Sequence, residues 1–426
     1  MATSSAKARD ALSVMVLGTG SFARSTAQIL ADAGARVATY LNRPRGRYAP
    51  TLSGPTFTAE AEPDLVALVK RWGADWVFPQ SIDWAQAPWA AALRRARIPI
   101  LCPTGEGLRL ERERDFARRL CVEHGIPFPA AHVAPNRLAA LAWLEKHPRP
   151  WVIKNPLCAP GSPVHTIVCE TVNDTRAWLD HVNYAEGVFL QEYLGRAEAG
   201  HLALVNGGDI VSLATNQEYK RSHAGELGVV CGAPLGGVVE RDPDDRYGLA
   251  RALLHPLRPW FRRVNFRGPV QVTACRARGR WQVLEYNVRL GITSGSMILR
   301  LLANPLAVLT DLVRGHTPSL RWRADRRFGC SITLAAHGYP HRPARMPALP
   351  VETTGAFDCD VWWNEVQPDR EGRLVTAGQR LADVAAYGPS LAVARKRVLT
   401  NLRRIHVLGG FYRPDVGVAL WPPGTE

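Results

Sequence analysis

Short apolar runs alternate with amphipathic stretches along the N-terminal part of the chain. Residues 12–17 (Leu-Ser-Val-Met-Val-Leu) have the pattern of a buried strand, and the stretch from about Phe22 to Ala33 has the period of a helix. Further apolar runs of strand length lie at residues 37–40, 76–78 and 98–101. Strands that alternate with helices favour a doubly wound parallel sheet with helices on both faces. We therefore expect a Rossmann-like domain over residues 1–105.

The rest of the chain divides into three parts by pattern. Arg109 to Glu123 predicts a charged helix, and the Gly-then-Pro order of residues 124–127 is typical of a helix end, so we expect a connecting helix and linker over residues 106–127. Residues 128–325 predict an α+β domain, with strands at 151–153, 188–191, 202–205, 270–272 and 283–286. Residues 326–426 predict a smaller α+β domain with a helix near Leu391 to Arg404.

Composition supports a globular protein of several domains. The 426 residues are 46% hydrophobic and 8% aromatic, which is enough to build cores. No stretch approaches the roughly 18 apolar residues of a membrane span, and the polar opening, residues 1–10, lacks the apolar run of a secretory signal, so we expect a cytoplasmic protein. The eight cysteines are scattered singly, which predicts reduced thiols and not a zinc site or a disulfide framework.

The charge is strongly positive, and it is carried almost entirely by arginine. A net charge of +15 would attract phosphate-bearing ligands, although a basic surface shaped by composition bias explains it equally well. Among the 53 basic residues, the lysines are confined to positions 7, 70, 146, 154, 220 and 396. A lysine retained inside a motif therefore stands out.

A glycine-rich loop follows the first predicted strand. Gly18-Thr19-Gly20-Ser21-Phe22-Ala23 would let a phosphate approach backbone N–H groups at a helix start, although a plain tight turn has the same residues. The second predicted strand ends in Tyr40-Leu41-Asn42-Arg43, without the acidic residue of an NAD site. Arg43 would tolerate a 2′-phosphate, so an NADP-linked oxidoreductase remains an alternative.

Two further motifs carry charge at strand ends. Glu285, Asn287 and Arg289 alternate, so they share one face, where a carboxylate, an amide oxygen and a guanidinium suit Mg²⁺ bound to polyphosphate. Lys154 closes a strand and opens the small-residue loop 155–162, from which an ammonium can reach phosphates, and Arg114 is a second candidate contact. The alternative is that all of these are solvated side chains at the ends of their elements.

Together, these motifs resemble one family: the phosphoribosylamine–glycine ligases, or glycinamide ribonucleotide synthetases, of the ATP-grasp superfamily. The likeness extends over nearly the whole chain. It is carried by residues 18–23, 103–104, 124–127, 152–154, 214–217, 220–221, 284–291, 298–300, 338–340, 377–378 and 413–417. The resemblance implies an N-terminal domain of the type that precedes an ATP-grasp domain, an ATP-grasp domain with two subdomains over residues 128–325, and a small C-terminal domain.

The resemblance also implies roles for individual residues. ATP would be bound by Arg114, which stands where the family has a lysine, and by Lys154, Gln191, Glu192 and Glu198, the last at the ribose. Glu285 and Asn287 would hold Mg²⁺ or Mn²⁺, while Arg289 and Lys220 would be catalytic. The substrate-binding residues would be Gly18, Gly20, Ser21, Arg221 and Gly291.

The chemistry implied is amide formation in purine biosynthesis. Members of the family form an acyl phosphate from glycine and ATP, and the amine of 5-phosphoribosylamine then attacks it. Positioning and charge compensation would account for catalysis, without a protein nucleophile. The expected partners are small molecules, namely ATP, an amino acid and a phosphorylated amine, bound by a monomer or homodimer, with no specific nucleic acid and no membrane.

Several positions depart from the family pattern. Gly291-Ile292-Thr293-Ser294 replaces Gly-Asp-Pro-Glu, Ser162 replaces a lysine, Gly228 to Ala233 replaces a glycine-rich loop, and Ser21-Phe22-Ala23 replaces charged residues. An ATP-grasp paralogue with a different acid or amine is therefore an alternative. A basic RNA-binding protein is a further one, although no aromatic-rich strand motif or clustered basic helix supports it.

Overall fold

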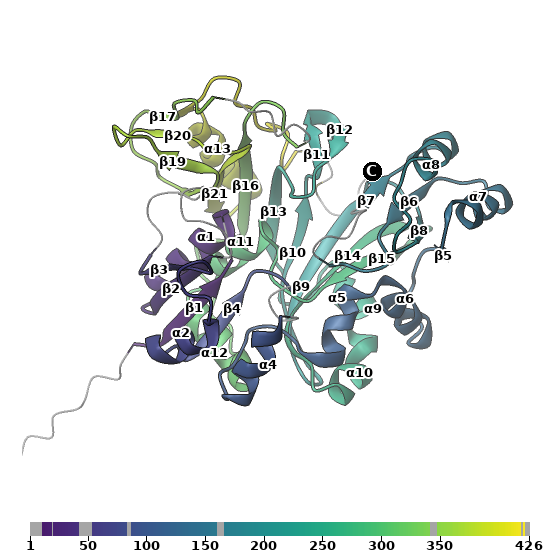
Figure 1. The fold of residues 1–426 in the computed structure, drawn as a ribbon, viewed down its shortest axis with the longest axis horizontal. Coiled ribbons are helices and arrows are strands. Elements are labelled where there is room, and N and C mark those ends of the chain that lie inside the picture. The colour runs from purple at the N-terminus through teal and green to yellow at the C-terminus, as the bar shows by residue number, and fades with distance from the viewer. Residues whose placement is uncertain are drawn as a thin grey trace, which may run out of the picture.

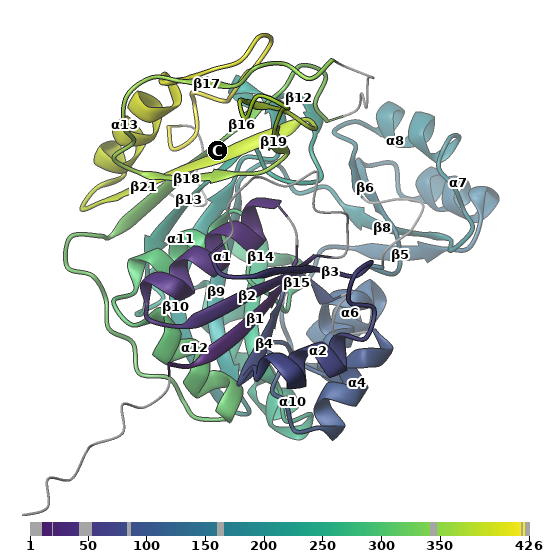
Figure 2. The same cartoon turned by 60° about the vertical axis from the view of Figure 1, so that its left-hand side comes forward.

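The computed structural model describes residues 11–18, 20–41, 53–82, 87–159, 166–340, 347–418 and 421. Within these residues the strands form a four-stranded parallel sheet, an eight-stranded antiparallel sheet and a four-stranded antiparallel sheet, besides three two-stranded ribbons (Figure 1). The three larger sheets correspond to an N-terminal domain, a main body and a part that projects from that body (Figure 2).

The N-terminal sheet is doubly wound, as predicted. Its strands run in the order β3 (Thr56–Thr58), β2 (Arg36–Leu41), β1 (Ser13–Leu17) and β4 (Trp76–Pro79). Side chains of β1 alternate between the two faces: Val14 and Val16 pack with α1 (Gly20–Asp32), whereas Met15 and Leu17 pack with α2 (Leu65–Trp72) and α4 (Pro88–Arg95). The apolar run 98–101 contributes only an isolated bridge from Ile100 to Val77, because the Cys102 N–H turns back onto the Ile100 carbonyl.

The connecting helix is broken, so the prediction of one continuous helix from Arg109 to Glu123 was wrong. It consists of α5 (Arg109–Arg112) and α6 (Arg114–Glu123), separated by Glu113 in an extended conformation, φ −118° and ψ 101°. Glu113 forms an antiparallel bridge with Leu157, and the Arg114 N–H donates to the Pro156 carbonyl at 3.1 Å. Pairing with the loop after Lys154 therefore overrides the helical pattern and fixes Arg114 beside that loop.

The projecting part is a small antiparallel sheet with two helices. Its strands run in the order β5 (Ala131–Ala134), β8 (Val188–Glu192), β6 (Trp151–Lys154) and β7 (Thr166–Val168). The helices α7 (Arg137–Lys146) and α8 (Val172–Leu179) cover one face through Leu144, Trp151, Ile153 and Leu179 (Figure 1). Lys154 of β6 and Gln191 of β8 reach the main body, where their side chains donate to the Leu284 and Val283 carbonyls.

The main body is the eight-stranded sheet. Its order is β15 (Arg280–Asn287), β14 (Arg267–Ala277), β9 (Glu198–Asn206), β10 (Asp209–Glu218), β13 (Gly236–Arg241), β16 (Phe328–Ala335), β21 (Arg380–Gly388) and β18 (Asp360–Trp363). The predicted boundary at residue 325 falls before β16, which pairs with β13, so the sheet continues across it. Two neighbouring regions of sequence thus share one sheet.

Helices and short ribbons complete the molecule. The helices are α9 (Leu249–Leu253), α10 (Arg258–Arg263), α11 (Ser294–Leu301), α12 (Pro305–Arg314) and α13 (Leu391–Leu402), with short 3₁₀ turns η2 (Gly105–Leu108), η3 (Ala224–Glu226) and η4 (His255–Leu257). The ribbons pair β11 (Arg221–His223) with β12 (Leu227–Val230), β17 (Glu352–Thr353) with β22 (Ile405–His406), and β19 (Val366–Pro368) with β20 (Leu374–Thr376).

Two further sequence expectations can be compared with these elements. All eight cysteines lie in the described part of the chain, where none forms a disulfide, and six of them are buried. Among the described helices, none is both long enough and apolar enough to cross a membrane.

Candidate active site

A cavity of about 820 Å³ lies between the projecting sheet and the main body. On one side it is lined by β6, β7 and the end of β8, and on the other by the first residue of β9, the end of β15 and the segments around residues 220 and 231. The predicted site residues that line it come from both sides: Lys154, Gln191, Glu192, Glu198, Lys220 and Glu285. Residues more than 100 positions apart in the sequence therefore meet in one place.

Glu285 is the acidic centre of this site. Burial raises the pKa of its carboxyl, but the surrounding positive charges of Lys154, Lys220, Arg114 and Arg289 outweigh burial and lower the pKa to about 2. The Arg114 Nη1 atom lies 3.4 Å from Glu285 Oε2. The carboxylate is therefore ionised at neutral pH, as a metal ligand must be.

Lys154 and Arg114 place their positive charges near Glu285. Lys154 is buried, and its Nζ atom donates to the Leu284 carbonyl at 3.2 Å. Burial, and then the charge of Arg114, lower the pKa of the Lys154 ammonium to about 8. The Arg114 Nε atom donates to the Asn155 carbonyl at 2.9 Å, which holds the guanidinium against the loop that follows β6. Two cations thus flank the entrance to that loop, where a polyphosphate would neutralise both.

Arg289 is held by a residue that the sequence analysis missed. The Arg289 Nε atom donates to Glu111 Oε1 at 3.0 Å, and Glu111 Oε2 accepts the Val288 N–H at 2.7 Å. Its Nη2 atom donates to the predicted metal ligand Asn287 at 3.2 Å. Burial raises the pKa of Glu111, whereas the charge of Arg289 and the Val288 hydrogen bond lower it. Its place in the charged connecting stretch does not distinguish Glu111 from the other acidic residues there.

Lys220 and Glu198 form an ion pair within the cavity. The Lys220 Nζ atom donates to Glu198 Oε2 at 2.8 Å. Burial lowers the pKa of Lys220, but the charges of Glu198, Glu285 and Glu218 outweigh it and raise the pKa. Glu198 was predicted at a ribose, and here its carboxylate orients a cationic side chain.

Two predicted ATP-binding residues, Gln191 and Glu192, are held by partners in other strands and segments. Gln191 is buried, and its Nε2 atom donates to the Val283 carbonyl at 3.2 Å, which ties β8 to β15. The Glu192 carboxylate accepts from Arg149 at 3.1 Å and from Arg278 at 2.6 Å. Glu192 therefore already has two cationic partners, and the backbone after it lines the cavity through Tyr193 and Leu194.

Known proteins similar in sequence to this chain belong to one family of ligases. Residues 329–419 match the family model described as phosphoribosylglycinamide synthetase, C domain. The chain is 29% identical to the phosphoribosylamine–glycine ligase of Streptomyces coelicolor over 367 residues, covering 83% of this chain and 86% of the relative. It is 25% identical to that of Ralstonia nicotianae over 375 residues, covering 83% and 86%. The chain is a homologue of the phosphoribosylamine–glycine ligases.

Solved structures show the same fold. The phosphoribosylamine–glycine ligase of Thermotoga maritima superposes with a TM-score of 0.77 at 23% identity, covering 95% of this chain and 100% of that one. The biotin carboxylase domain of Hydrogenobacter thermophilus 2-oxoglutarate carboxylase, solved with Mg-ADP and bicarbonate, superposes with a TM-score of 0.70 at 13% identity, covering 94% and 91%. The multidomain α/β and α+β architecture is thus that of the ATP-grasp fold.

The residues expected on the substrate side of a phosphoribosylamine–glycine ligase are more dispersed. A Cβ atom at Gly18 would lie 2.7 Å from Gln80 Oε1, and one at Gly20, where φ is +58°, would collide with Asn364. Glycine is therefore needed at both positions, because neighbouring side chains leave no room for a Cβ atom. Ser21 is buried at the start of α1. Within the described residues none of these three lines the cavity. Thr19 and Ser162 lie outside the described residues.

Arg221 finds its partners outside the charge cluster of this ligase homologue. Its guanidinium donates to Glu170 at 2.5 Å and to the Gly228 carbonyl at 2.7 Å. These bonds link β11 with β12 and with the segment after β7. A direct substrate contact by Arg221 remains a prediction, while its observed partners hold the projecting part against the body.

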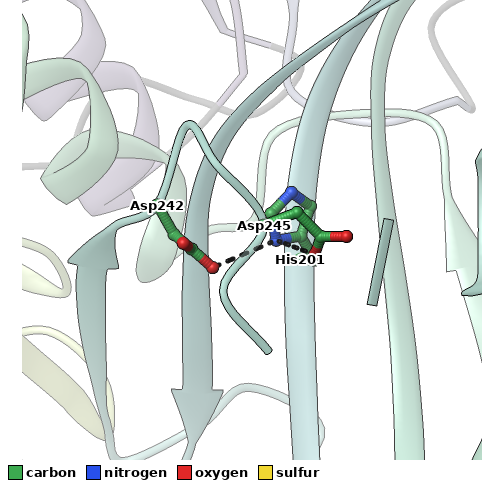
Figure 3. A group of neighbouring side chains, drawn as sticks. All are labelled: His201, Asp242 and Asp245. Carbon is green, nitrogen blue, oxygen red and sulfur yellow. Dashed lines mark ion pairs between the residues drawn. The ribbon is translucent and has the colours of Figure 1, made fainter. Parts of the chain in front are cut away.

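A second polar cluster lies inside the main body, and Figure 3 shows both of its ion pairs ending on one ring nitrogen of His201. His201 Nδ1 lies 3.9 Å from Asp242 and 3.8 Å from Asp245. The Thr215 hydroxyl lies 3.0 Å from the same nitrogen and donates to Asp242 Oδ2 at 2.7 Å, while Asp245 Oδ1 accepts the Ala250 N–H at 2.9 Å. Because the oxygens that face His201 already accept hydrogen bonds, we interpret this group, although it could hold a metal ion, as a structural network.

Proposed function

We propose that this chain is an ATP- and Mg²⁺-dependent ligase that joins glycine to 5-phosphoribosylamine. The observation that carries the proposal is Glu285, an ionised carboxylate surrounded by four cationic side chains beside a cavity large enough for a nucleotide. We take glycine and 5-phosphoribosylamine as the substrates because the relatives are named phosphoribosylamine–glycine ligases. Cations gathered around one carboxylate suit a reaction that moves negative charge among phosphate groups.

The residues present fit a Mg²⁺ ion. Glu285 and Asn287 offer a carboxylate and an amide oxygen on neighbouring outward positions of β15, and Mg²⁺ binds one or two such oxygens together with substrate phosphates. When bound, the ion would neutralise charge on the phosphates of ATP. Lys154 and Arg114 would hold the phosphates, and the backbone of Tyr193 and Leu194 would border the base.

The chain's own residues would contribute by positioning and charge. A carboxylate oxygen of glycine would attack the γ-phosphorus of ATP, forming the acyl phosphate as ADP leaves. The amine nitrogen of the acceptor would then attack the acyl carbon, lose a proton and release phosphate. Arg289, held by Glu111, and Lys220, held by Glu198, would face the charge that develops on the transferred group. We further propose that Gly18, Gly20, Ser21, Arg221 and Gly291 serve substrate binding.

The test is ADP release by the purified protein with Mg-ATP, glycine and freshly generated phosphoribosylamine, each omitted in turn. Release that requires all three, with a product mass equal to that of the amide, is the expected result. ATP binding without cleavage for this substrate pair would overturn the assignment of substrates.

A paralogue with a different acid or amine is the second candidate. It is favoured by the loop after Gly291, which carries Ile292-Thr293-Ser294 and no acidic side chain. A panel of other carboxylic acids and amines in the same assay would identify its substrates. Titration with NADPH tests the third alternative, an NADP-linked oxidoreductase, which predicts saturable binding of NADPH and none of Mg-ATP.

A further inference from the structure

Glu218, the last residue of β10, is a carboxylate that the mechanism above does not use. Its neighbours in the site are paired: Lys220 with Glu198, Arg289 with Glu111, and Arg114 with Glu285. In the described part of the chain, no hydrogen bond or ion pair is formed by the Glu218 carboxylate. Glu218 is half-buried, and burial raises the pKa of its carboxyl, because a carboxylate that loses water without gaining a partner is destabilised. Such a group is suited to receive a ligand.

Three oxygen atoms from separate segments converge at Gly291. A Cβ atom placed on Gly291 would lie 3.6 Å from Glu218 Oε1 and 3.3 Å from Gln271 Oε1, and it would collide with the Ser294 hydroxyl. Gln271 and Ser294 are both buried, and the Ser294 hydroxyl lies 3.3 Å from Gln271 Oε1. Glycine at position 291 thus allows three oxygens, one from a carboxylate and two neutral, to gather close to its backbone.

A primary ammonium fits this set of oxygens. It offers three N–H donors and one positive charge, and the site offers three oxygens and one negative charge. Arg289 and Lys220 lie near enough for their charges to lower the pKa of Glu218, so a carboxylate on the same small molecule would find cationic partners beside the oxygen cluster. A zwitterion with adjacent ammonium and carboxylate groups satisfies both halves of the arrangement.

We propose that Glu218, together with Gln271 and Ser294, binds the ammonium group of an α-amino acid above Gly291 and so selects amino acids over carboxylic acids that lack an amino group. This inference deepens the proposed function and rests on it. Glu218 would thus provide a carboxylate to the substrate, since the loop from Ile292 to Ser294 contains none.

The experiment compares Glu218→Gln, which removes the charge and keeps the shape, with Glu218→Asp, which keeps the charge. We expect KM for glycine to rise about 10- to 100-fold in Glu218→Gln, the loss associated with one charged hydrogen bond, with KM for ATP unchanged and partial recovery in Glu218→Asp. Glu106→Gln, which changes a surface glutamate paired with Arg263, is the matched control and should behave as the wild type.

Equilibrium dialysis of labelled glycine, with Mg²⁺ and a non-hydrolysable ATP analogue, provides a readout that does not need turnover. Unchanged glycine affinity in Glu218→Gln would overturn the inference, and so would a change confined to the Mg²⁺ dependence, which would make Glu218 a metal ligand. If the wild type does not bind glycine, glycine is not the substrate. The dialysis is then repeated with other amino acids, each compared with its analogue that lacks the amino group. Wild-type preference for a des-amino analogue, or no binding of any amino acid, would then overturn the inference itself.

Discussion

Two polar clusters are buried against the same eight-stranded sheet, and they differ in where their charges find partners. In the cluster of His201, Asp242 and Asp245, the oxygens that face the ring accept hydrogen bonds from Thr215 and from the start of α9. In the cluster around Glu285, four cations surround one carboxylate beside a cavity, and Glu218 keeps no partner in the described residues. The difference teaches that burial of charge alone does not single out a candidate site, whereas an adjoining cavity and a carboxylate without a partner do.

We call the cluster around Glu285, which borders the cavity, the open cluster, and the cluster of His201, Asp242 and Asp245 the closed cluster. The largest effect is expected from neutralising charged residues of the open cluster. Glu285→Gln and Lys154→Gln should each lower kcat/KM by about 10³-fold or more, because the first removes the proposed carboxylate ligand of Mg²⁺ and the second removes a positive charge that would hold the phosphates of ATP. Circular dichroism should show an unchanged fold. Glu145→Gln and Lys146→Gln change adjacent exposed residues of α7 and serve as controls. Full activity in both site variants would show that the cluster is not the catalytic one.

Substitutions in the closed cluster should change the free energy of unfolding and leave ATP binding unchanged. Asp242→Asn removes a fully buried charge that accepts from Thr215 and Arg246, and should lower the free energy of unfolding by about 3 kcal/mol. Urea unfolding measures this, and Asp209→Asn, at an exposed position, is the control. ATP affinity of the folded variant should match that of the wild type. Lost ATP binding with unchanged stability would reverse our interpretation of the two clusters.

The pKa of Lys154 predicts how the open cluster depends on pH. Burial and Arg114 lower that pKa to about 8, so the ammonium loses its charge as the pH rises through about 8. In the free enzyme, kcat/KM for ATP should then fall, by at most about tenfold per pH unit. Lys154→Arg should remove this alkaline limb, since arginine stays protonated. An alkaline limb that survives the substitution would assign it to another group.

The smallest effect concerns His201 in the closed cluster. Burial lowers its pKa, although Asp245 and Asp242 oppose this and His255 reinforces it. The unfolded chain therefore takes up the proton first, so stability present above the ordinary pKa of about 6.5 is lost as the pH falls below it, by at most about 1.4 kcal/mol per pH unit. Urea titrations between pH 7.5 and 5 give the free energy of unfolding of the wild type and of His201→Gln. The pH slopes of the two should differ by up to this amount. Parallel curves would show that His201 does not titrate on unfolding.

The sequence pattern predicted those features that depend on residues close together in the chain. The apolar run in residues 12–17 predicted β1, and charged residues at strand ends predicted Lys154 and Glu285, which do share one cavity. The sequence analysis did not find the break at Glu113, because it depends on pairing with Leu157. Glu111 and Glu218 were missed for the same reason: their significance comes from Arg289 and Gly291, far along the chain. Nothing local indicates that Arg221 turns to Glu170.

The continuity of the large sheet across residue 325 limits how the protein can be divided. Because β16 forms backbone hydrogen bonds with β13, a fragment that ends at residue 325 would expose the edge of β13 as an open template for other chains. A fragment that begins there would lose the partner of β16 as well. The family-model match at residues 329–419 therefore marks a unit of sequence recognition and not one of independent folding. Exchange of this segment between homologues should succeed only when β13 is exchanged with it.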